Sequence, residues 1–236
     1  MSTILRNVKD SSWSQRLFAV VLGCNAPLVL WGIRVEPSIL TPNGIATTIA
    51  VIAMQVAIAV LAFFGPLSFQ QYRASIGIPL VLALLFAVAY DGVLLTNFIP
   101  SLNVDINVFL LFLAVASLAG FLAGYHTGSF MQGVVAGFWA LVIGTAIWSI
   151  GLMTINYAFW GSHQWFLFWK NDGAIDDFHR SGATNLHLFL LQDMQGALFF
   201  HPLLSAVVGT ICGVITSSLA QAVLWLRRRL AYSPTS

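Results

Sequence analysis

Apolar residues run continuously through six long stretches of the chain instead of alternating with polar ones. The hydrocarbon layer of a membrane is about 30 Å thick, so a spanning helix needs roughly 20 mostly apolar residues. Barrel strands are shorter and alternate in polarity, which argues against them here. The pattern therefore predicts an all-α integral membrane protein in which residues 1–236 form a single membrane domain. The predicted spans are 17–33, 44–65, 76–99, 107–126, 133–158 and 202–226.

One connection between these spans is much longer than the others and is rich in charged and aromatic residues. It covers 159–201 and includes FWKNDGAIDDFHRSG at 168–182, although charged residues make up only 8% of the chain. We interpret it as an extracytoplasmic cap at the membrane interface, between the fifth and sixth spans. Its apolar part, 184–201, carries many polar residues. We therefore expect an interfacial or re-entrant helix there, with Pro202 starting the last span.

Local signals predict a turn and a helix inside this cap. An Asn-Asp-Gly sequence at 171–173 is a turn signal, and 174–180 follows it as one short helix. Asp176 and Arg180 are one helical turn apart, which favours an i,i+4 ion pair worth about 0.2–0.5 kcal/mol. Exposure to water at the membrane surface accounts for most of the charge in this stretch.

The composition agrees with a membrane environment. Hydrophobic residues make up 58% of the chain, and its charged fraction is far below the quarter or so that is usual in soluble domains. Such a chain could not cover its surface in water, so membrane lipids are its expected surroundings. Ten Lys and Arg residues stand against eight Asp and Glu residues. This balance leaves no broad basic surface and argues against nucleic acid as a partner.

The distribution of basic residues predicts the orientation. An even number of spans puts both termini on one side, and that side holds most of the basic residues but a single acid, Asp10. The positive-inside rule then predicts a multi-pass protein of the plasma membrane with cytoplasmic N- and C-termini. The basic residues on the predicted cytoplasmic side are Arg6, Lys9, Arg16, Arg73, Arg227, Arg228 and Arg229.

An aspartate inside the third span is the strongest candidate for a functional residue. Placing the Asp91 carboxylate at mid-membrane costs on the order of 2.5–3.5 kcal/mol, so it is expected to face a cavity, to pair, or to be protonated. A carboxyl group hydrogen-bonded between helices is the competing interpretation. Thr96, Asn97 and Asn156 are expected in the same outer half of the membrane. Together these four residues predict a ligand-binding polar cavity that opens outward.

Polar residues of the cap form a second candidate set. His179 and His187 are eight residues apart, which is too far for both to bind one metal ion from a single helix. Zinc-binding and calcium-binding spacings are also absent, so we predict neither a metal site nor a cofactor. The candidate cap residues are Asp176, Asp177, His179, Arg180 and His187.

Glycines spaced by four residues predict close helix packing. Such spacing lets helix backbones approach one another in lipid. The pairs before and after the turn at 127–132 predict a tight hairpin of the fourth and fifth spans. The same faces could instead bind a second copy of the chain or a partner membrane subunit. The glycines concerned are Gly120, Gly124, Gly128, Gly133, Gly137, Gly209 and Gly213.

Three functions are compatible with these patterns. The favoured one is transport, or binding of a small ligand or lipid, through an outward-facing polar cavity around Asp91. The alternative is a structural or accessory subunit of a membrane complex that packs through its glycine faces. A lipid-directed membrane enzyme that uses the His and Asp residues of the cap is the third. Nucleophile, P-loop and dinucleotide motifs are absent from the sequence, so no catalytic residue is assigned.

Overall fold

The computed structural model describes residues 11–72, 75–102 and 108–231, which are helical and contain no β-strand. Six of their helices are long and apolar enough to cross a membrane, as the sequence predicts. The helices, including two short 3₁₀ turns labelled η, are α2 (Ser11–Val35), η1 (Pro37–Ile39), α3 (Pro42–Phe63), α4 (Gly77–Phe98), η2 (Pro100–Leu102), α5 (Val108–Thr127), α6 (Phe130–Ala158), α7 (His163–Asp172), α8 (Ala174–Ser181) and α9 (Leu186–Ala231).

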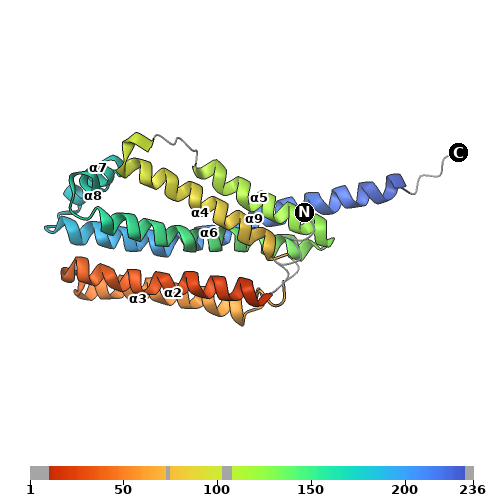
Figure 1. Cartoon of the computed structure of the whole chain (residues 1–236), viewed down its shortest axis with the longest axis horizontal. Helices are drawn as coiled ribbons and strands as arrows, with labels where there is room; N and C mark the ends of the chain where they lie inside the picture. The colour runs from red at the N-terminus through yellow and green to blue at the C-terminus, as the bar shows by residue number, and fades with distance from the viewer. Residues whose placement is uncertain (1–10, 73–74, 103–107, 232–236) are drawn as a thin grey trace.

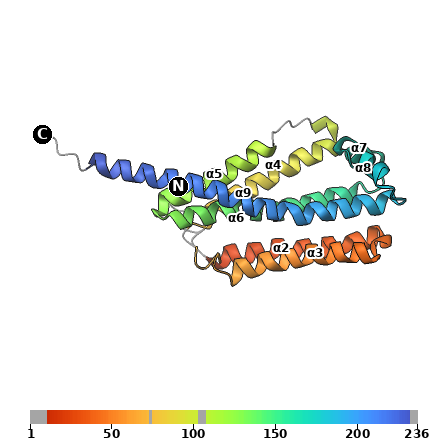
Figure 2. The same cartoon turned by 180° about the vertical axis from the view of Figure 1, so that it is seen from behind.

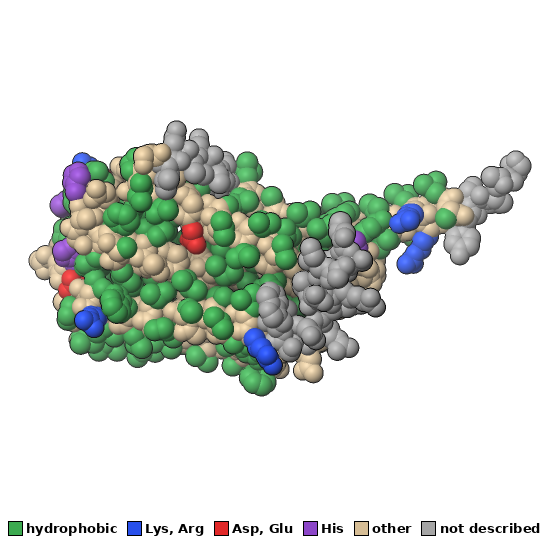
Figure 3. Space-filling model, in the orientation of Figure 1, with side chains coloured by type: hydrophobic (Ala, Val, Ile, Leu, Met, Phe, Trp, Pro, Cys, Tyr) green, Lys and Arg blue, Asp and Glu red, His purple; other side chains and the backbone are tan. Residues whose placement is uncertain are grey.

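The long helices form two layers (Figure 1 and Figure 2). In one layer, α4, α5 and α9 surround α6; in the other, the antiparallel pair α2 and α3 packs against α6 and α9. The short helices α7 and α8 cover one end of the bundle, here called the cap end, and both described chain ends lie at the opposite end. Most of the charged and histidine side chains visible in Figure 3 lie toward the two ends, and one acidic side chain lies part-way along the bundle. This arrangement is compatible with a polytopic membrane protein.

Helix α6 is the centre of the bundle. Of its most apolar 18-residue window, 83% is buried inside the protein, against 28–33% for the corresponding windows of the other long helices. Close backbone contacts make this possible. A Cβ atom on Gly137 would lie 2.6 Å from the carbonyl oxygen of Gly209, and one on Gly213 would lie 2.7 Å from that of Val134. Only glycine allows helices to approach this closely.

The predicted glycine faces are therefore covered by the chain's own helices. Gly120 of α5 and Gly133 of α6 face each other, so the predicted α5–α6 hairpin is present. Gly124 packs against Ser217 of α9. These glycines have an internal packing role, and assembly with a second copy or a partner subunit stays a prediction that would need other faces.

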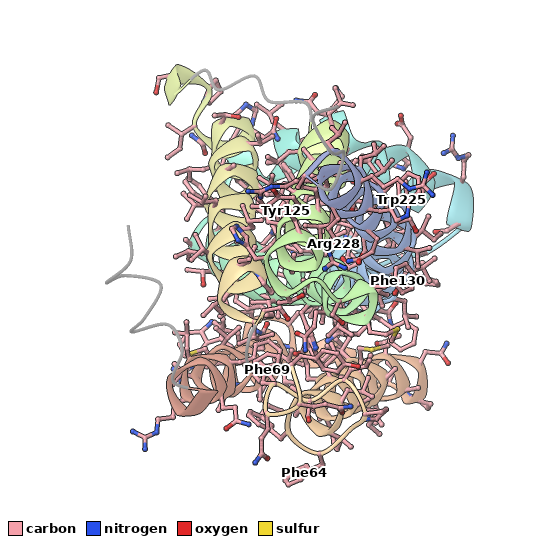
Figure 4. The ribbon with its side chains drawn as sticks, turned by 90° about the vertical axis from the view of Figure 1, so that its right-hand side faces the viewer. Phe64, Phe69, Tyr125, Phe130, Trp225 and Arg228 are labelled. Atoms are coloured by element: carbon pink, nitrogen blue, oxygen red, sulfur yellow. The ribbon has the colours of Figure 1, made fainter. Side chains whose placement is uncertain are left out.

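Aromatic side chains join the two layers near the end opposite the cap. Phe69 is fully buried and packs against Phe18 and Trp139, with ring centroids 5.3 Å and 4.8 Å away. The indole nitrogen of Trp139 donates to the carbonyl oxygen of Leu67 at 2.7 Å. In Figure 4, which looks along the bundle from this end, Phe69 lies between the layers and Phe64 points away from them. Buried aromatic contacts thus fix the connection between α3 and α4 against α6.

Several polar side chains inside the long helices join one helix to another. Asn25 of α2 donates to the carbonyl oxygen of Ala146 in α6 at 2.9 Å. Gln195 of α9 accepts from the hydroxyl group of Thr47 at 2.7 Å and donates to that of Thr48 at 3.0 Å, both in α3. Such bonds satisfy groups that would otherwise be costly in lipid.

The cap consists of α7 and α8, joined at Gly173. The backbone there has φ of 91°, a left-handed conformation that glycine adopts readily. The predicted short helix at 174–180 is present as α8. The predicted Asp176–Arg180 pair is wrong, because Arg180 pairs instead with Asp177, three residues before it. Both partners are exposed to solvent, so the choice between two neighbouring carboxylates has little energetic weight.

The last helix differs most from its prediction. Helix α9 begins at Leu186 and continues through Pro202 to Ala231, so the connection between the last two long helices, α6 and α9, covers 159–185 and not 159–201. Residues 186–201 are neither re-entrant nor a separate helix. Leu190, Leu191 and Met194 are at most 1% exposed in this part. Burial of one face against the neighbouring helices lets polar residues occupy the rest, which an average over the sequence does not reveal.

Candidate functional site

A cavity of about 230 Å³ lies directly under the cap, and we call it the cap-end cavity. It occupies the space between α4 and α9; α6 forms its floor and α7 its roof. Helices α4 and α9 both pack against α6, and the gap between them is bridged by the aromatic end of α7. Its lining residues are Tyr90, Val93, Leu94, Asn97, Trp148, Leu152, Phe168, Trp169, Asp172, Asp193, Met194, Ala197 and His201.

Two carboxylates mark the mouth of the cap-end cavity. Asp172, the last residue of α7, and Asp193 of α9 both line the cavity and are both exposed to solvent. No lysine or arginine is among the lining residues. Partial burial, and then the negative charge of Asp177, raise the pKa of Asp172. A cation at the mouth would relieve both effects, because it replaces lost hydration and offsets the neighbouring negative charge.

Aromatic rings form the walls below the mouth. The rings of Tyr90 and Trp148 stack with centroids 5.0 Å apart and planes 8° apart. Trp148 also meets His201 edge to face at 4.6 Å. Phe168 and Trp169 of α7 complete the aromatic lining from above. Aromatic faces carry negative electrostatic potential and attract cations, so the walls and the mouth favour the same charge.

Two buried indole groups of the cavity have no hydrogen-bond partner. Trp148 is 3% exposed and Trp169 is 4% exposed, and the Nε1 atom of each is buried without an acceptor among the described residues. Leaving such a donor unsatisfied costs about 1–3 kcal/mol. Both nitrogen atoms are buried away from the cavity surface, so this cost belongs to the packing of the cavity walls and not to a contact with a bound molecule.

The structure brings together only part of the predicted polar cavity. Asn97 lines the cap-end cavity, but Asp91, Thr96 and Asn156 do not. Thr96 donates its hydroxyl hydrogen to the carbonyl oxygen of Val93 at 2.7 Å. Asn156 is fully buried and donates to the carbonyl oxygen of its own helix one turn earlier, at 3.0 Å.

Asp91 lies on a different side of α4 from the cavity. Its carboxyl group packs over Gly151 of α6, where an added Cβ atom would overlap it. One carboxyl oxygen, Oδ1, is buried and has no hydrogen-bond partner among the described residues. The neighbouring Tyr90 faces the cap-end cavity, because successive helix residues point about 100° apart. The residues of the predicted polar cavity are therefore divided between two places: Asn97 lines the cap-end cavity, whereas Asp91 packs over Gly151.

The predicted cap residues do not converge on one point. Asp176 and His179 are exposed, and Asp177 pairs with Arg180. The His187 ring packs against those of Trp160 and Trp165, at 5.7 Å and 5.0 Å. Its Nδ1 atom is 4.0 Å from a carboxylate oxygen of Glu36. No group of three His, Cys, Asp or Glu side chains in the described part of the chain is placed to hold a metal ion.

The sequence contained one unused signal for the cap-end cavity. Asp193, Ala197 and His201 are spaced by four, so they share one face of a helix if that helix is continuous through 201. We expected 184–201 to be an interfacial or re-entrant helix separate from the last span, so its faces were not placed against the other long helices. Asp172, Trp148 and Trp169 reach the cavity from other helices, and no spacing along the chain relates them to α9.

Comparison of the chain with protein-family models, curated proteins and solved structures finds no match.

Proposed function

We propose that this protein is a ligand-binding membrane component, of the kind used in transport, that takes a small organic cation into the cap-end cavity. The observation that carries the proposal is the pairing of Asp172 and Asp193 at the mouth of an aromatic cavity without a lysine or arginine in its lining. A compact ammonium group on the aromatic walls is worth roughly 0.5–2 kcal/mol per favourable contact. The carboxylates add attraction that also speeds capture.

The size of the cavity limits the ligand. A volume of about 230 Å³ suits a molecule with fewer than about a dozen non-hydrogen atoms. Choline serves as the probe because it is a compact quaternary ammonium ion.

Binding to the purified full-length protein in lipid nanodiscs tests the proposal. Isothermal titration is carried out with choline and with 3,3-dimethyl-1-butanol, which has the same shape but no charge. We expect choline to bind and the uncharged analogue to bind at least about tenfold more weakly, as expected when one charged contact is lost. Equal affinity for the two, or no binding of either, would overturn the proposal.

Variants of the mouth provide the matched control. Asp172→Asn and Asp193→Asn are expected to weaken choline binding, because each removes a charge that lines the cavity. Asp176→Asn removes an exposed charge from the same cap, outside the cavity lining, and is expected to leave affinity unchanged. If all three variants bind alike, the carboxylates at the mouth do not recognise the ligand.

A role as an accessory subunit is the second candidate, and one feature of α9 favours it. The helix has 46 residues, or about 69 Å at about 1.5 Å per residue, and its C-terminal part extends beyond the bundle (Figure 2). Figure 4 shows Trp225 and Arg228 on this extension. Leu219, Val223, Leu226 and Leu230 lie along one face of it and are 42–77% exposed.

A substitution on this face tests the second candidate. Leu226→Arg is expected to convert a complex or oligomer to the single chain in size-exclusion chromatography with light scattering. Ser218→Arg changes an exposed polar position of the same helix and serves as its control. A wild-type chain that is already a monomer without companions would remove the support for this role.

A further inference from the structure

The arginines at the end opposite the cap have no acidic counterparts nearby among the described residues. Arg227, Arg228 and Arg229 are all exposed on the C-terminal extension of α9. Both ion pairs that the described residues form lie at the cap end. The described acidic residues also lie nearer the cap: Glu36, Asp91, Asp172, Asp176, Asp177 and Asp193. This part of the surface therefore favours an anionic partner.

Two of these arginines border a corner between the α9 extension and the end of the α5–α6 hairpin. Arg227 donates to the hydroxyl oxygen of Tyr125 in α5 at 3.2 Å. Arg228 follows Gln221 by seven residues, or about two turns, so both leave α9 on the same side. Gln221 donates to the carbonyl oxygen of Gly124 in α5 at 3.2 Å, so this side faces α5. We call Tyr125, Arg227 and Arg228 the arginine corner; Figure 4 looks onto this end of the bundle and labels Tyr125 and Arg228.

Phosphate is the anion that suits the arginine corner. The planar guanidinium group of Arg227 can give a phosphate two parallel hydrogen bonds. The Tyr125 hydroxyl oxygen accepts from Arg227 and keeps its own hydrogen to donate. Arg228, the next residue, adds a second positive charge. A phosphate bound here would thus meet donors from two helices, α5 and α9.

The depth of the corner along α9 favours a lipid headgroup over a soluble anion. Large apolar side chains are exposed along this helix from Phe200 onward, and Phe200 itself is 68% exposed. Arg228 follows Phe200 by about 28 residues in the same helix, or about 42 Å. A bilayer with its headgroups is about 40–45 Å thick, so the arginines reach the headgroups of the far leaflet. Trp225, exposed one turn before Arg229, is of a residue type enriched at that level.

We infer that the arginine corner binds the headgroup of an anionic phospholipid, with its phosphate on Arg227 and Tyr125. The headgroup has a net negative charge, because a zwitterionic one would bring its own ammonium group toward Arg228. Arg229 is held over the ring of Trp225, with its guanidinium carbon 4.1 Å from the ring centroid. Arg227 and Arg228 are therefore the arginines that meet the phosphate.

This inference does not depend on the proposed cation site. The arginine corner lies at the opposite end of the bundle and shares no residue with the lining of the cap-end cavity. It is also separate from the leucine face of the α9 extension, because Arg228 points about 200° away from Leu226. A failure to bind choline would leave the inference standing, and loss of the lipid would leave the cation site standing.

Native mass spectrometry of the purified full-length protein in detergent tests the inference. The protein is titrated with an equimolar mixture of phosphatidylglycerol and phosphatidylcholine that have the same acyl chains. We expect complexes with phosphatidylglycerol to be at least about fivefold more abundant, since one arginine near an anionic lipid contributes about that factor. Equal abundance of the two complexes would overturn the inference. Binding of inorganic phosphate in place of the lipid would also overturn it, as would a stoichiometric acidic protein that Arg227→Gln releases.

Variants of the corner are compared with a variant of equal charge elsewhere at the same end. Arg227→Gln is expected to reduce the preference for phosphatidylglycerol about fivefold. Tyr125→Phe removes only the hydroxyl group and should reduce it about twofold or more. Arg16→Gln is the control, because Arg16 is exposed on α2 in the other layer.

The control decides between a site and a general attraction. If Arg16→Gln and Arg227→Gln lose the same preference, net charge and not the corner attracts the lipid, and the inference is wrong. If Arg227→Gln elutes as an aggregate, Tyr125→Phe against Arg16→Gln still decides, because only the first of these changes the corner.

Discussion

The carboxyl group of Asp91 in α4 lies over Gly151 in α6, with no room between them for a methyl group. The absence of a side chain at 151 is what lets an acidic side chain fit between two membrane helices. Asp91 points about 100° away from its neighbour Tyr90, which lines the cap-end cavity, and Gly151 leaves room for it against α6.

Replacing Gly151 with alanine is expected to displace the Asp91 side chain. The overlapping atoms belong to the end of a side chain that can rotate, so we expect a modest loss of stability, about 1 kcal/mol. Thermal unfolding in detergent measures it. Gly92→Ala is the control, because an added Cβ there has no atom within 4 Å. Equal melting temperatures for the two variants would show that Asp91 does not rest on Gly151.

A second glycine tests the packing of α9 against α6. Gly213→Ala is expected to cost about 1–3 kcal/mol or more, since the clash is with backbone atoms of Val134 that cannot move unless the helices separate. Gly196→Ala in the same helix has open space around the new Cβ. That control should be neutral or stabilising by up to about 1 kcal/mol, because alanine favours helix. Chemical denaturation in micelles compares the two, and a stable Gly213→Ala would refute the close contact.

The polar contact between α3 and α9 is expected to stabilise the attachment of the α2–α3 layer. Gln195→Leu removes the bonds to Thr47 and Thr48 and should cost about 0.6–1.7 kcal/mol, the usual range for such bonds between membrane helices. Gln192→Leu changes a partly exposed glutamine of the same helix and is the control. Limited proteolysis of the α2–α3 layer should be faster in Gln195→Leu alone. Equal rates would indicate that apolar packing suffices.

A rise in pH is expected to lower the folding stability and to raise the choline affinity, both through Asp172 at the mouth of the cap-end cavity. Burial and Asp177 raise the pKa of Asp172, so the folded chain keeps this proton at a pH where the unfolded chain, with a pKa of about 3.9, has lost it. Folding stability from this group therefore falls as pH rises through that window. Choline affinity should rise over the same window, because the cation needs the ionised carboxylate. Titration calorimetry at several pH values measures the affinity and thermal unfolding at the same pH values measures the stability, and Asp172→Asn should reduce the pH dependence of both.

The predicted orientation is tested by cysteine labelling in intact cells. After Cys24 and Cys212 are replaced by alanine, a cysteine at Ser181 in the cap should react with an impermeant maleimide from outside. A cysteine at Ala231, at the opposite end of the bundle, should react only after the cells are permeabilised. The reverse pattern would place both termini outside and contradict the positive-inside prediction.

Some features of the candidate sites could be read from the sequence and others could not. Asp91 stood out because an isolated acid in an apolar run is costly wherever it points. Asn97 lines the cap-end cavity, and the sequence predicted its height in the span but not the direction in which it points. Asp193 was assigned to the cap because the polar residues of 184–201 hid a buried face of α9. Asp172 looked like an ordinary turn residue, and nothing in its local sequence related it to α9.

The sequence by itself determined that the chain has six long apolar helices, that its two termini lie at the same end of the bundle, and that a polar cap lies at the other end. These follow from the length and the apolar character that a helix needs in lipid, and both are local properties. Only the tertiary structure decided which helix faces meet: that Asp172, Asp193 and Trp148 border one cavity, and that Tyr90 lines this cavity whereas Asp91 packs over Gly151. The physical reason is that a side chain makes a contact only where a neighbouring helix lies close enough to meet it. That closeness is set by glycine contacts far apart in the chain.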